Sequence, residues 1–329
     1  MKFFRRQFLH LAAGAAVLPA LSRIARAQTY PSRPITMIVP FAAGGGTDVV
    51  GRMVAERIRA SLGQPVIIEN VGGANGSIGV GRVARSAPDG YTLCVGVWNT
   101  HVSNGASYPL QYNVTSDFEP IGLVSIYPGL IVARNTLLAN GLVGLINWLK
   151  ANTDKASMGI PGAGAASHIY GLLFQKETGT RFQFVPYRGN ALALQDLVAG
   201  EIDLMFDAPA GCLPLVRAGQ IKAYAVMSKS RFVAAPEIPT VDEAGLPGFY
   251  ASNWNALFAP KGTPKNVVDK VNAAIREAMG NANIRQRLTD LGQEIPLPEQ
   301  QTPQALRVLQ KAEIEKWWPI IKAANIRAE

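Results

Sequence analysis

Short runs of β-branched and other apolar residues alternate with amphipathic segments from the start of the chain to about residue 229. This alternation is typical of strand–helix–strand units with mostly parallel sheets, so the fold class is α/β. The pattern predicts strands at 35–41, 66–70, 92–97, 121–125, 130–133, 156–160, 182–186, 202–206 and 223–227.

Between the first two strands, apolar residues recur every three or four positions, which predicts a helix that Asp48 begins and Gly63 ends. Similar patterns predict helices at 169–178 and 190–199, each followed by a glycine. After a last strand at 254–258 the pattern is helical, at 264–279, 284–291 and 303–324.

Removal of the leader described below leaves about 300 residues, more than one compact core usually serves, so two lobes are expected. A helical C-terminal segment usually packs back onto an earlier lobe. We therefore assign 28–132 plus 252–329 to lobe one and 133–251 to lobe two. The chain then crosses twice between lobes, near Ala133 and Ala251, and two such crossings form a hinge.

The first 27 residues have the pattern of a signal peptide: a basic start, an apolar stretch at 8–21, and a cleavage site after Ala27. The apolar stretch is shorter than the ~20 residues that a membrane span needs. Arg5 and Arg6 resemble the twin-arginine export motif, and an ordinary Sec signal is the alternative. Either route predicts a periplasmic protein.

The leader holds five of the 32 Lys and Arg residues and no acid, so the mature chain has a net charge of 27 − 23 = +4. Its basic residues are spread among acids, which argues against nucleic acid as a partner. A small positive excess is compatible with an anionic small ligand.

Only two cysteines, Cys94 and Cys212, and two mature histidines, His101 and His168, are present. The composition excludes a disulfide scaffold and disfavours a metal site, and no cofactor is expected. A bridge between the two cysteines remains open, although both have small or apolar neighbours, as buried free thiols do.

A glycine-rich loop follows the first predicted strand and leads into the first helix. Consecutive glycines let the backbone approach a ligand closely, and the unpaired N–H groups of the helix N-terminus favour an anion. A plain tight turn is the alternative, but it needs only one glycine. The candidate binding residues here are Ala43, Gly44, Gly45, Gly46, Thr47 and Asp48.

A second loop of small residues follows the predicted strand at 156–160 in lobe two. If the lobes face each other, both helix N-termini point into one cleft, which suits a carboxylate. Ser167 either binds the ligand or caps the helix. The candidates here are Gly164, Ala165, Ala166, Ser167 and His168.

Other candidates stand singly at the ends of predicted strands. Arg188 offers a bidentate partner for a carboxylate, or is a solvated surface residue. Asp207 accepts a hydrogen bond from the ligand, or caps the segment after it. Aromatic residues that wall the cleft, or pack in the core instead, are Phe41, Trp98 and Trp254.

Catalysis is disfavoured. Ser167 and His168 are adjacent on a helix and point in different directions, and no nucleophile-elbow motif is present. The pattern at Gly79 to Ala84 formally matches a dinucleotide-binding loop, but without a strand directly before it. An exported enzyme acting on a carboxylate, with His168 and Asp207 in the cleft, is the alternative.

Several motifs together resemble the Bug-type receptors of tripartite tricarboxylate transporters. They are the loop at 40–48, Pro88-Asp89-Gly90-Tyr91, Asp117-Phe118-Glu119-Pro120, the segment at 186–189, Gly200-Glu201-Ile202-Asp203 and the segment at 259–264. The resemblance covers essentially the whole mature chain.

The resemblance implies a type II periplasmic binding-protein fold, with each lobe a mixed, mostly parallel sheet flanked by helices. It also implies that the two strand-to-helix loops grip a small organic acid, largely through backbone amides and waters. The implied partner is a membrane transporter, and a sensor protein is the alternative. Trp98 stands where the family has a smaller stretch, which predicts a ligand longer than succinate or one with a ring.

Overall fold

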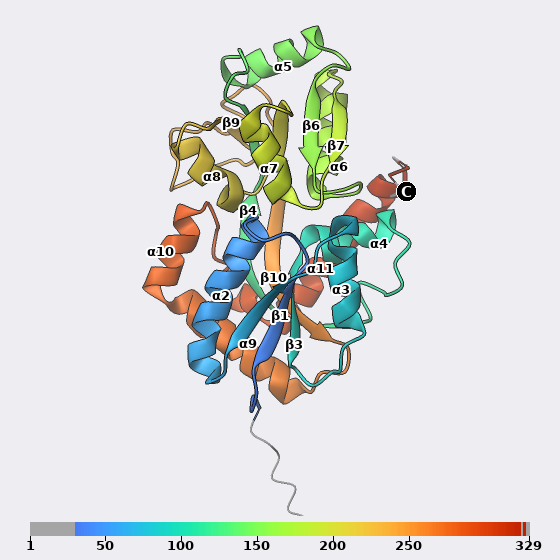
Figure 1. Ribbon diagram of the computed structural model, residues 1–329, viewed down its shortest axis with the longest axis vertical. Helices are drawn as coiled ribbons and strands as arrows, with labels where there is room; N and C mark the ends of the chain where they lie inside the picture. Colours follow the sequence, from blue (N-terminus) through green and yellow to red (C-terminus); the bar gives the residue numbers. More distant parts are fainter. Residues whose placement is uncertain (1–29, 324, 327–329) are drawn as a thin grey trace, which may run out of the picture.

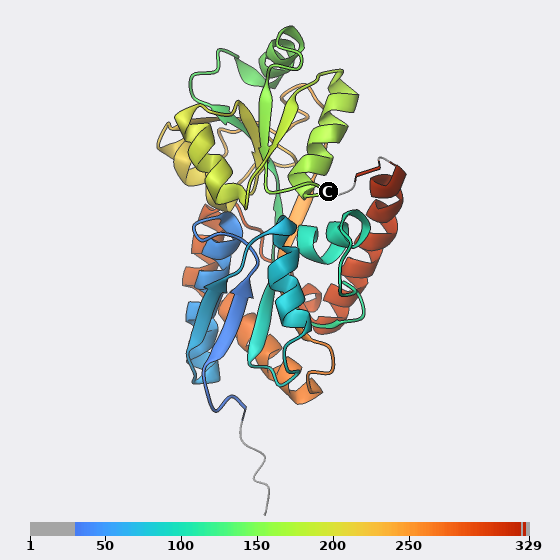
Figure 2. The same cartoon turned by 45° about the vertical axis from the view of Figure 1, so that its right-hand side comes forward.

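Two five-stranded sheets, with strand orders β2-β1-β3-β10-β4 and β7-β6-β8-β5-β9, form the framework. They lie one above the other along the long axis (Figures 1 and 2) in this computed structural model, which describes residues 30–323 and 325–326. The first sheet contains β1 (Ile35–Val39), β2 (Val66–Asn70), β3 (Thr92–Val97), β4 (Phe118–Pro128) and β10 (Ser252–Pro260). The second contains β5 (Leu130–Arg134), β6 (Ser157–Ile160), β7 (Gln183–Pro186), β8 (Leu204–Asp207) and β9 (Ile221–Val226).

All of the predicted strands are therefore present, and the prediction of two lobes with mixed sheets is confirmed. The predicted signal peptide at 1–27 lies outside the described residues. Each sheet has one strand, β10 or β5, that runs against the other four. In both sheets this reversed strand is the one that arrives from the other lobe.

The chain changes sheet at Gly129, between β4 and β5. Gly129 N donates to Ala251 O at 3.0 Å, and Met227 N donates to Gly129 O at 2.8 Å, so both connections between the lobes lie side by side. A Cβ on Gly129 would lie 2.0 Å from Met227 Cε, so a side chain here would require the end of Met227 to move. The expected first crossing, near Ala133, falls inside β5, and residues 130–132 pair in the second sheet.

Helices cover both faces of each sheet, as Figure 1 shows. On the first sheet, α2 (Gly46–Leu62) and α9 (Lys265–Gly280) share one core, which α10 (Ala282–Asp290) extends. The other face carries the short helix η1 (Ala74–Gly76), α3 (Ser77–Ala84), the π-helical turn η2 (Asn99–Ser103), α4 (Asn104–Ser107) and α11 (Pro303–Ala323). The short helix η3 (Pro298–Gln301) precedes α11 and is tied to α9, since Asn272 Nδ2 donates to Gln301 O at 2.7 Å. On the second sheet, α7 (Asn190–Ala199) and α8 (Pro209–Arg217) face α5 (Gly141–Ala151) and α6 (Ala166–Thr178) across the strands.

The predicted helices at α2, α6, α7, α9, α10 and α11 are present, whereas α3, α5 and α8 were not predicted. Pro209, Gly211 and Pro214 lie in α8, and Gly141 and Gly144 lie in α5. Proline is favoured at the first helical position, where Pro209 lies, but Pro214 and the glycines are poor helix formers, so the tertiary contacts of both helices outweigh their local preference. The helix after β8 matters because its N-terminus lies at the site described below.

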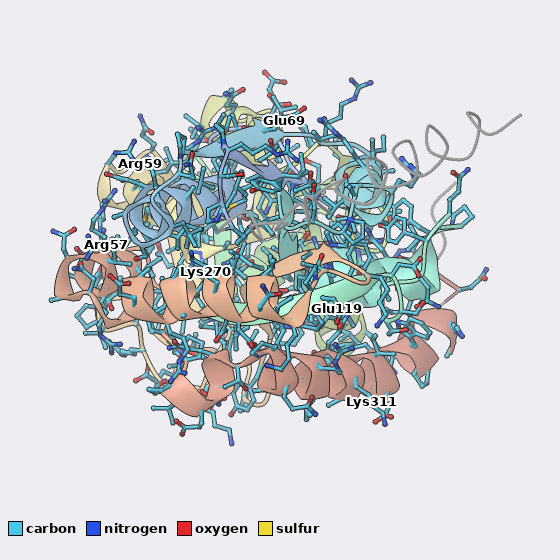
Figure 3. All side chains as sticks on the ribbon, turned by 90° about the horizontal axis from the view of Figure 1, so that it is seen from below. Arg57, Arg59, Glu69, Glu119, Lys270 and Lys311 are labelled. Carbon is cyan, nitrogen blue, oxygen red and sulfur yellow. The ribbon has the colours of Figure 1, made fainter. Side chains whose placement is uncertain are left out.

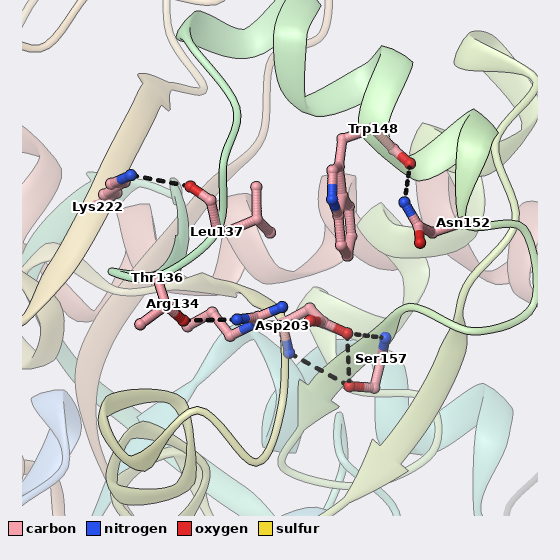
Figure 4. A network of polar contacts seen from close by, with 8 residues as sticks. All are labelled: Arg134, Thr136, Leu137, Trp148, Asn152, Ser157, Asp203 and Lys222. Carbon is pink, nitrogen blue, oxygen red and sulfur yellow. Dashed lines mark hydrogen bonds and ion pairs between the residues drawn. The ribbon is translucent and has the colours of Figure 1, made fainter.

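A half-buried carboxylate, Asp203, secures the start of β8, at the end away from Asp207 (Figure 4). Asp203 accepts hydrogen bonds from Arg134 Nε at 2.8 Å, from Ser157 N at 2.9 Å and from Ser157 Oγ at 3.1 Å. These contacts join the ends of β5 and β6 to β8. The network holds the strands that carry the site in lobe two.

Acidic and basic side chains intermix on the outer surface of lobe one, seen from below in Figure 3. Glu119 accepts from Lys261 at 2.9 Å and from Arg307 at 3.0 Å, which ties β4 to the segment before α9 and to α11. Other charged side chains labelled on this view are Arg57, Arg59, Glu69, Lys270 and Lys311.

Within residues 30–323 and 325–326, no helix has both the length and the apolar character that a membrane crossing requires. Cys94 in β3 and Cys212 in α8 are buried free thiols in separate hydrophobic cores. Burial raises the pKa of both thiols, so neither is a reactive thiolate at neutral pH.

Candidate binding site between the lobes

A cavity lies between the two sheets, where strands of both lobes end. Its volume, taken as the space open to the centre of a water molecule, is about 60 Å³. One water needs ~10–15 Å³ on the same measure. It is lined by Phe41, Ala42, Gly45, Gly46, Thr47, Val97, Asn99, Tyr127, Gly129, Pro161, Ala166, Ser167, Tyr170, Asn190, Phe206, Asp207, Ala208, Met227 and Asn253. We call this the interlobe cavity.

Four helices begin at the interlobe cavity. The first residues of α2, α6 and α7 line it, as does Ala208, the residue before α8. No side chain at the N-cap position of these helices bonds the first amides. Each helix N-terminus carries a partial positive charge of about half an elementary charge. Since no Lys, Arg or His lines the cavity, these amides are its positive groups, and they suit an anion.

The loops before α2 and α6 have the same construction. Gly44 N donates to Asp48 Oδ2 at 2.9 Å, and Gly164 N donates to His168 Nδ1 at 3.0 Å, in each case four residues apart. Gly44 and Gly164 both have a positive φ, of 86° and 74°, which side chains disfavour. The side chain on the third helical residue therefore closes each loop against its own helix.

Asp48 belongs to this loop closure and not to the cavity lining. Besides Gly44 N, it accepts from Arg52 Nε at 2.9 Å and from Asn70 Nδ2 at 2.8 Å, and its side chain is 3% exposed. Burial acts to raise the pKa of Asp48, but the hydrogen bonds from Arg52, Gly44 and Asn70 outweigh it and hold the pKa below its usual value. Asp48 is thus an ionised structural group.

His168 likewise faces the loop and the core. Its ring meets Phe184 edge to face at 4.5 Å between centroids, and burial lowers its pKa to about 4, so it is neutral at pH 7. Because Nδ1 accepts from Gly164 N, the proton is on Nε2. The ring makes no hydrogen bond with Ser167.

Of the predicted binding residues, Gly45, Gly46, Thr47, Ala166, Ser167 and Asp207 line the cavity, as does Phe41. The others do not: Ala43, Gly44 and Arg188 are exposed, and Asp48, Gly164, Ala165 and His168 lie behind the lining. The backbone of Arg188 faces Gly72 of lobe one, so Arg188 stands where the two lobes meet, outside the cavity lining.

The expectation that Trp98 and Trp254 wall the cleft is corrected. Trp98 is fully buried, donates from Nε1 to Glu313 at 2.7 Å and packs edge to face on Trp317, because it lies just before the π-helical turn and points into the core. Trp254 is 3% exposed and lies on the opposite face of β10 from Asn253, which lines the cavity. The inference of a ring-bearing or longer ligand from Trp98 loses its basis.

Sequence reasoning missed the polar residues that complete the lining: Asn99, Tyr127, Tyr170, Asn190 and Asn253. Asn190 had a signal, since it opens a predicted helix directly after a strand. Tyr170 also had one, as it lies three to four residues after the Ala166 and Ser167 pair on the same helical face. No sequence signal marked Asn99, Tyr127 or Asn253, because their positions depend on how strands of the first sheet meet the second lobe.

Three polar side-chain atoms of the lining are buried without a protein partner: Ser167 Oγ, Asn190 Oδ1 and Asp207 Oδ2. Asn190 Nδ2 donates a hydrogen bond to Asp207 Oδ1. Burial raises the pKa of Asp207 to about 6, against the lowering effect of the Ala208 amide and Asn190. Buried polar groups normally have partners, so these atoms indicate where a ligand or water binds.

The lobes touch around the cavity. Asn99 Oδ1 of lobe one accepts from Ala166 N, the first amide of α6 in lobe two, at 2.8 Å. A Cβ on Gly46 would lie 3.3 Å from Ala208 Cβ and from Gly211 N of lobe two. The structure is therefore a closed arrangement of the two lobes.

Two α/β lobes that close on a cavity between them define the class of periplasmic binding proteins. A family model described as the tripartite tricarboxylate transporter family receptor matches residues 50–326, and the chain belongs to this family. It is 38% identical to the periplasmic binding protein BugD, with a TM-score of 0.86, covering 91% of this chain and 100% of that one.

Two further solved structures are similar and were determined with ligands. MatC from Rhodopseudomonas palustris, with bound malate, is 40% identical over 89% of this chain and 100% of that one, with a TM-score of 0.85. A second R. palustris protein, solved with adipate, is 32% identical over 90% of this chain and 99% of that one, also with a TM-score of 0.85.

Proposed function

We propose that this protein is a periplasmic receptor that captures a small carboxylate in the interlobe cavity and passes it to the membrane subunits of a tripartite transporter. The observation that carries the proposal is the meeting of four helix N-termini at one cavity that no cationic side chain lines. Membership of the receptor family supports it. So do the similar proteins solved with malate and with adipate, both carboxylates.

The physical basis of capture is the replacement of water by fixed dipoles. A carboxylate that leaves water loses its hydration, and this cost is offset only where hydrogen-bond donors are already in place. The first amides of α2 and α6, at Gly46, Thr47 and Ser167, are such donors, and the Ser167 hydroxyl adds another. Since they are held by their helices, they need no rearrangement when the ligand binds.

Capture also requires the cavity to open. The two connections at Gly129 and Ala251 lie side by side and are hydrogen-bonded to each other, so rotation about this pair separates the lobes as rigid bodies. The contacts that must break include the bond from Ala166 N to Asn99, the approach of Gly46 to α8, and the packing of Tyr170 on Trp98. A ligand bound to both lobes replaces these contacts and favours closure.

Binding without turnover fits the side chains near the cavity. A hydrolytic role for Ser167 needs a base, and the adjacent His168 has its Nδ1 engaged by Gly164 N and its ring against Phe184. Asp207, at the end of β8, is bonded to Asn190 and not to Ser167 or His168.

Thermal unfolding of the ligand-stripped mature protein with a panel of carboxylates tests the proposal. A bound acid at about 100 times its dissociation constant stabilises the fold by about 2.7 kcal/mol, which for this size raises Tm by roughly 5 °C. The methyl esters of the same acids are the control, because they keep the shape and lose the charge. If the esters raise Tm as much as the acids, or if no acid raises it, the proposal is wrong.

A further inference from the structure

The acceptor end of the interlobe cavity has a definite chemistry. Asp207 Oδ2 and Asn190 Oδ1 both line it and are buried without a partner. Asn190 must direct Nδ2 at the Asp207 carboxylate, since a carboxylate only accepts, and this leaves its oxygen free. Two adjacent acceptor oxygens in the cavity therefore have no hydrogen-bond donor from the protein.

No protein group supplies that donor. The residues that face Asp207 are Asn190 on α7, Leu130 on β5, Tyr127 on β4 and Cys212 on α8. Tyr127 and Cys212, the titratable ones, have pKa values raised by burial and are neutral. Asn190 and the Ala208 amide are donors to Asp207, but Oδ2 has no partner and no cation lies in the cavity lining. A buried carboxylate in this state is costly, so a further donor is expected to come from outside the protein.

Resting on the proposed function, we propose that the ligand carries a hydrogen-bond donor beside its carboxylate, a hydroxyl or an ammonium group, and that Asp207 accepts from it. The carboxylate then lies at the first amides of α2 and α6 with the Ser167 hydroxyl, and the donor group at Asp207 and Asn190. Asp207 is thus the residue that selects among carboxylic acids. Hydroxy and amino acids share this donor chemistry, and the test separates them.

Protonation of Asp207 makes the selection depend on pH. Burial raises the pKa of Asp207 to about 6, so the group is ionised at pH 7.5 and largely protonated at pH 5. An ionised Asp207 accepts a hydrogen bond from the hydroxyl or ammonium group of a ligand. It repels the carboxylate of an acid that lacks such a group. A protonated Asp207 donates, which removes that repulsion and weakens the preference for a donor-bearing ligand.

Isothermal titration calorimetry at pH 7.5 tests this with acids that share a carbon skeleton: succinate, L-malate and L-aspartate, then glutarate, 2-hydroxyglutarate and L-glutamate. Hydrogen bonds to a buried charge correspond to about a tenfold or larger difference in affinity. The hydroxy or the amino member is expected to bind at least about tenfold more tightly than the unsubstituted acid. Whichever of the two binds more tightly, the hydroxy acid or the amino acid, identifies the donor group of the ligand as a hydroxyl or an ammonium group.

Two variants locate the effect. Asp207→Asn keeps the size and removes the charge, so the preference within each set is expected to shrink below about threefold, with the unsubstituted acid gaining affinity. Ser167→Ala, the matched control in the same cavity, is expected to weaken all members of a set to a similar degree. If Asp207→Asn fails to fold, the wild-type preference at pH 7.5 and pH 5 gives the same information.

The outcomes separate the two proposals. Equal affinities within each set, a preference that Asp207→Asn leaves unchanged, or a preference that persists unaltered at pH 5 overturns the role of Asp207 and leaves carboxylate capture standing. A wild-type protein that binds no member of either set overturns both.

Discussion

The loops before α2 and α6 share one backbone conformation, but a different side chain closes each of them by accepting a hydrogen bond from the loop glycine. In lobe one, Gly44 N is held by the ionised Asp48, which also binds Arg52 and Asn70. In lobe two, Gly164 N is held by neutral His168, which otherwise only packs on Phe184. The geometry of such a loop thus requires an acceptor on the third helical residue, and it tolerates either a carboxylate or an imidazole there.

The loops differ again at the first helical residue, which is Gly46 in one and Ala166 in the other. Both are buried and both line the cavity. A side chain at 46 would press on Ala208 and Gly211, because α8 of the opposite lobe crosses there. At 166 the opposite lobe contributes Asn99, which bonds the amide and leaves room for a methyl group. The comparison separates what a loop needs locally from what its partner lobe imposes.

The largest expected effect is the loss of stability when Asp48, which closes the loop before α2, is replaced. Asp48→Ala removes a buried acceptor with three donors, Gly44 N, Arg52 Nε and Asn70 Nδ2, so the free energy of unfolding is expected to fall by about 3 kcal/mol. Urea denaturation followed by circular dichroism measures it. A loss below about 1 kcal/mol would mean that Asp48 is not what holds this loop.

Gly46→Val tests the contact between the lobes. The added atoms overlap with α8 only when the lobes are closed, so the closed form is expected to lose about 1–3 kcal/mol and ligand affinity to fall about 10–100-fold. Gly280→Val is the control, because nothing lies within 4 Å of a Cβ there. Calorimetry with a bound acid measures both variants, and an unchanged affinity in Gly46→Val contradicts the closed geometry.

His168, which closes the loop before α6, is expected to contribute less to the free energy of unfolding than Asp48 does. His168→Ala loses one hydrogen bond and one aromatic contact, and a decrease of about 1–2 kcal/mol in the free energy of unfolding is expected. His168→Asn is the matched control, since its amide oxygen is able to accept from Gly164 N and should restore part of the loss. Equal losses in the two variants would assign the effect to packing and not to the hydrogen bond.

The smallest effect is a difference in pH dependence. The folded-state pKa of His168 is lowered to about 4 by burial, so between pH 6.5 and 4 the unfolded chain binds a proton that the folded chain does not, and stability falls as pH falls. Asp48, with its lowered pKa, loses stability only below about pH 4. Asp207, raised to about 6, acts in the opposite direction and gains stability between pH 6 and 4.

Denaturation of wild type and His168→Asn at pH 7, 6 and 5 isolates this contribution. The variant is expected to lose less stability on acidification, by up to about 1.4 kcal/mol per pH unit, the value for one proton. His101, whose pKa burial lowers to about 3, contributes equally in both proteins and cancels. Identical pH profiles would show that His168 is not buried as a neutral group.

Local pattern was sufficient for the strands and for the helices with a continuous apolar stripe, such as α2 and α9. It was insufficient for α8, whose two prolines and glycine read as a loop. Local pattern also located both binding loops, because a strand, small residues and a helix start follow one another directly in the chain. It misplaced Trp98, because this side chain is held in the core by Glu313 and Trp317 of α11, at least 215 residues away, and no local periodicity signals such contacts.

By itself, then, the sequence determined the α/β class, the strand-to-helix loops with Gly44 and Gly164, and the carboxyl end of β8 where Asp207 lies. These follow from backbone preferences and hydrogen bonds among residues close in the chain. Only the tertiary structure decided that a side chain at Gly46 would crowd α8, that Asn99 reaches Ala166, and that Asn190 and Asp207 leave two acceptors open. The first two features arise where the lobes meet and the third where α7 meets β8, and contacts between distant segments leave no periodic trace in either one.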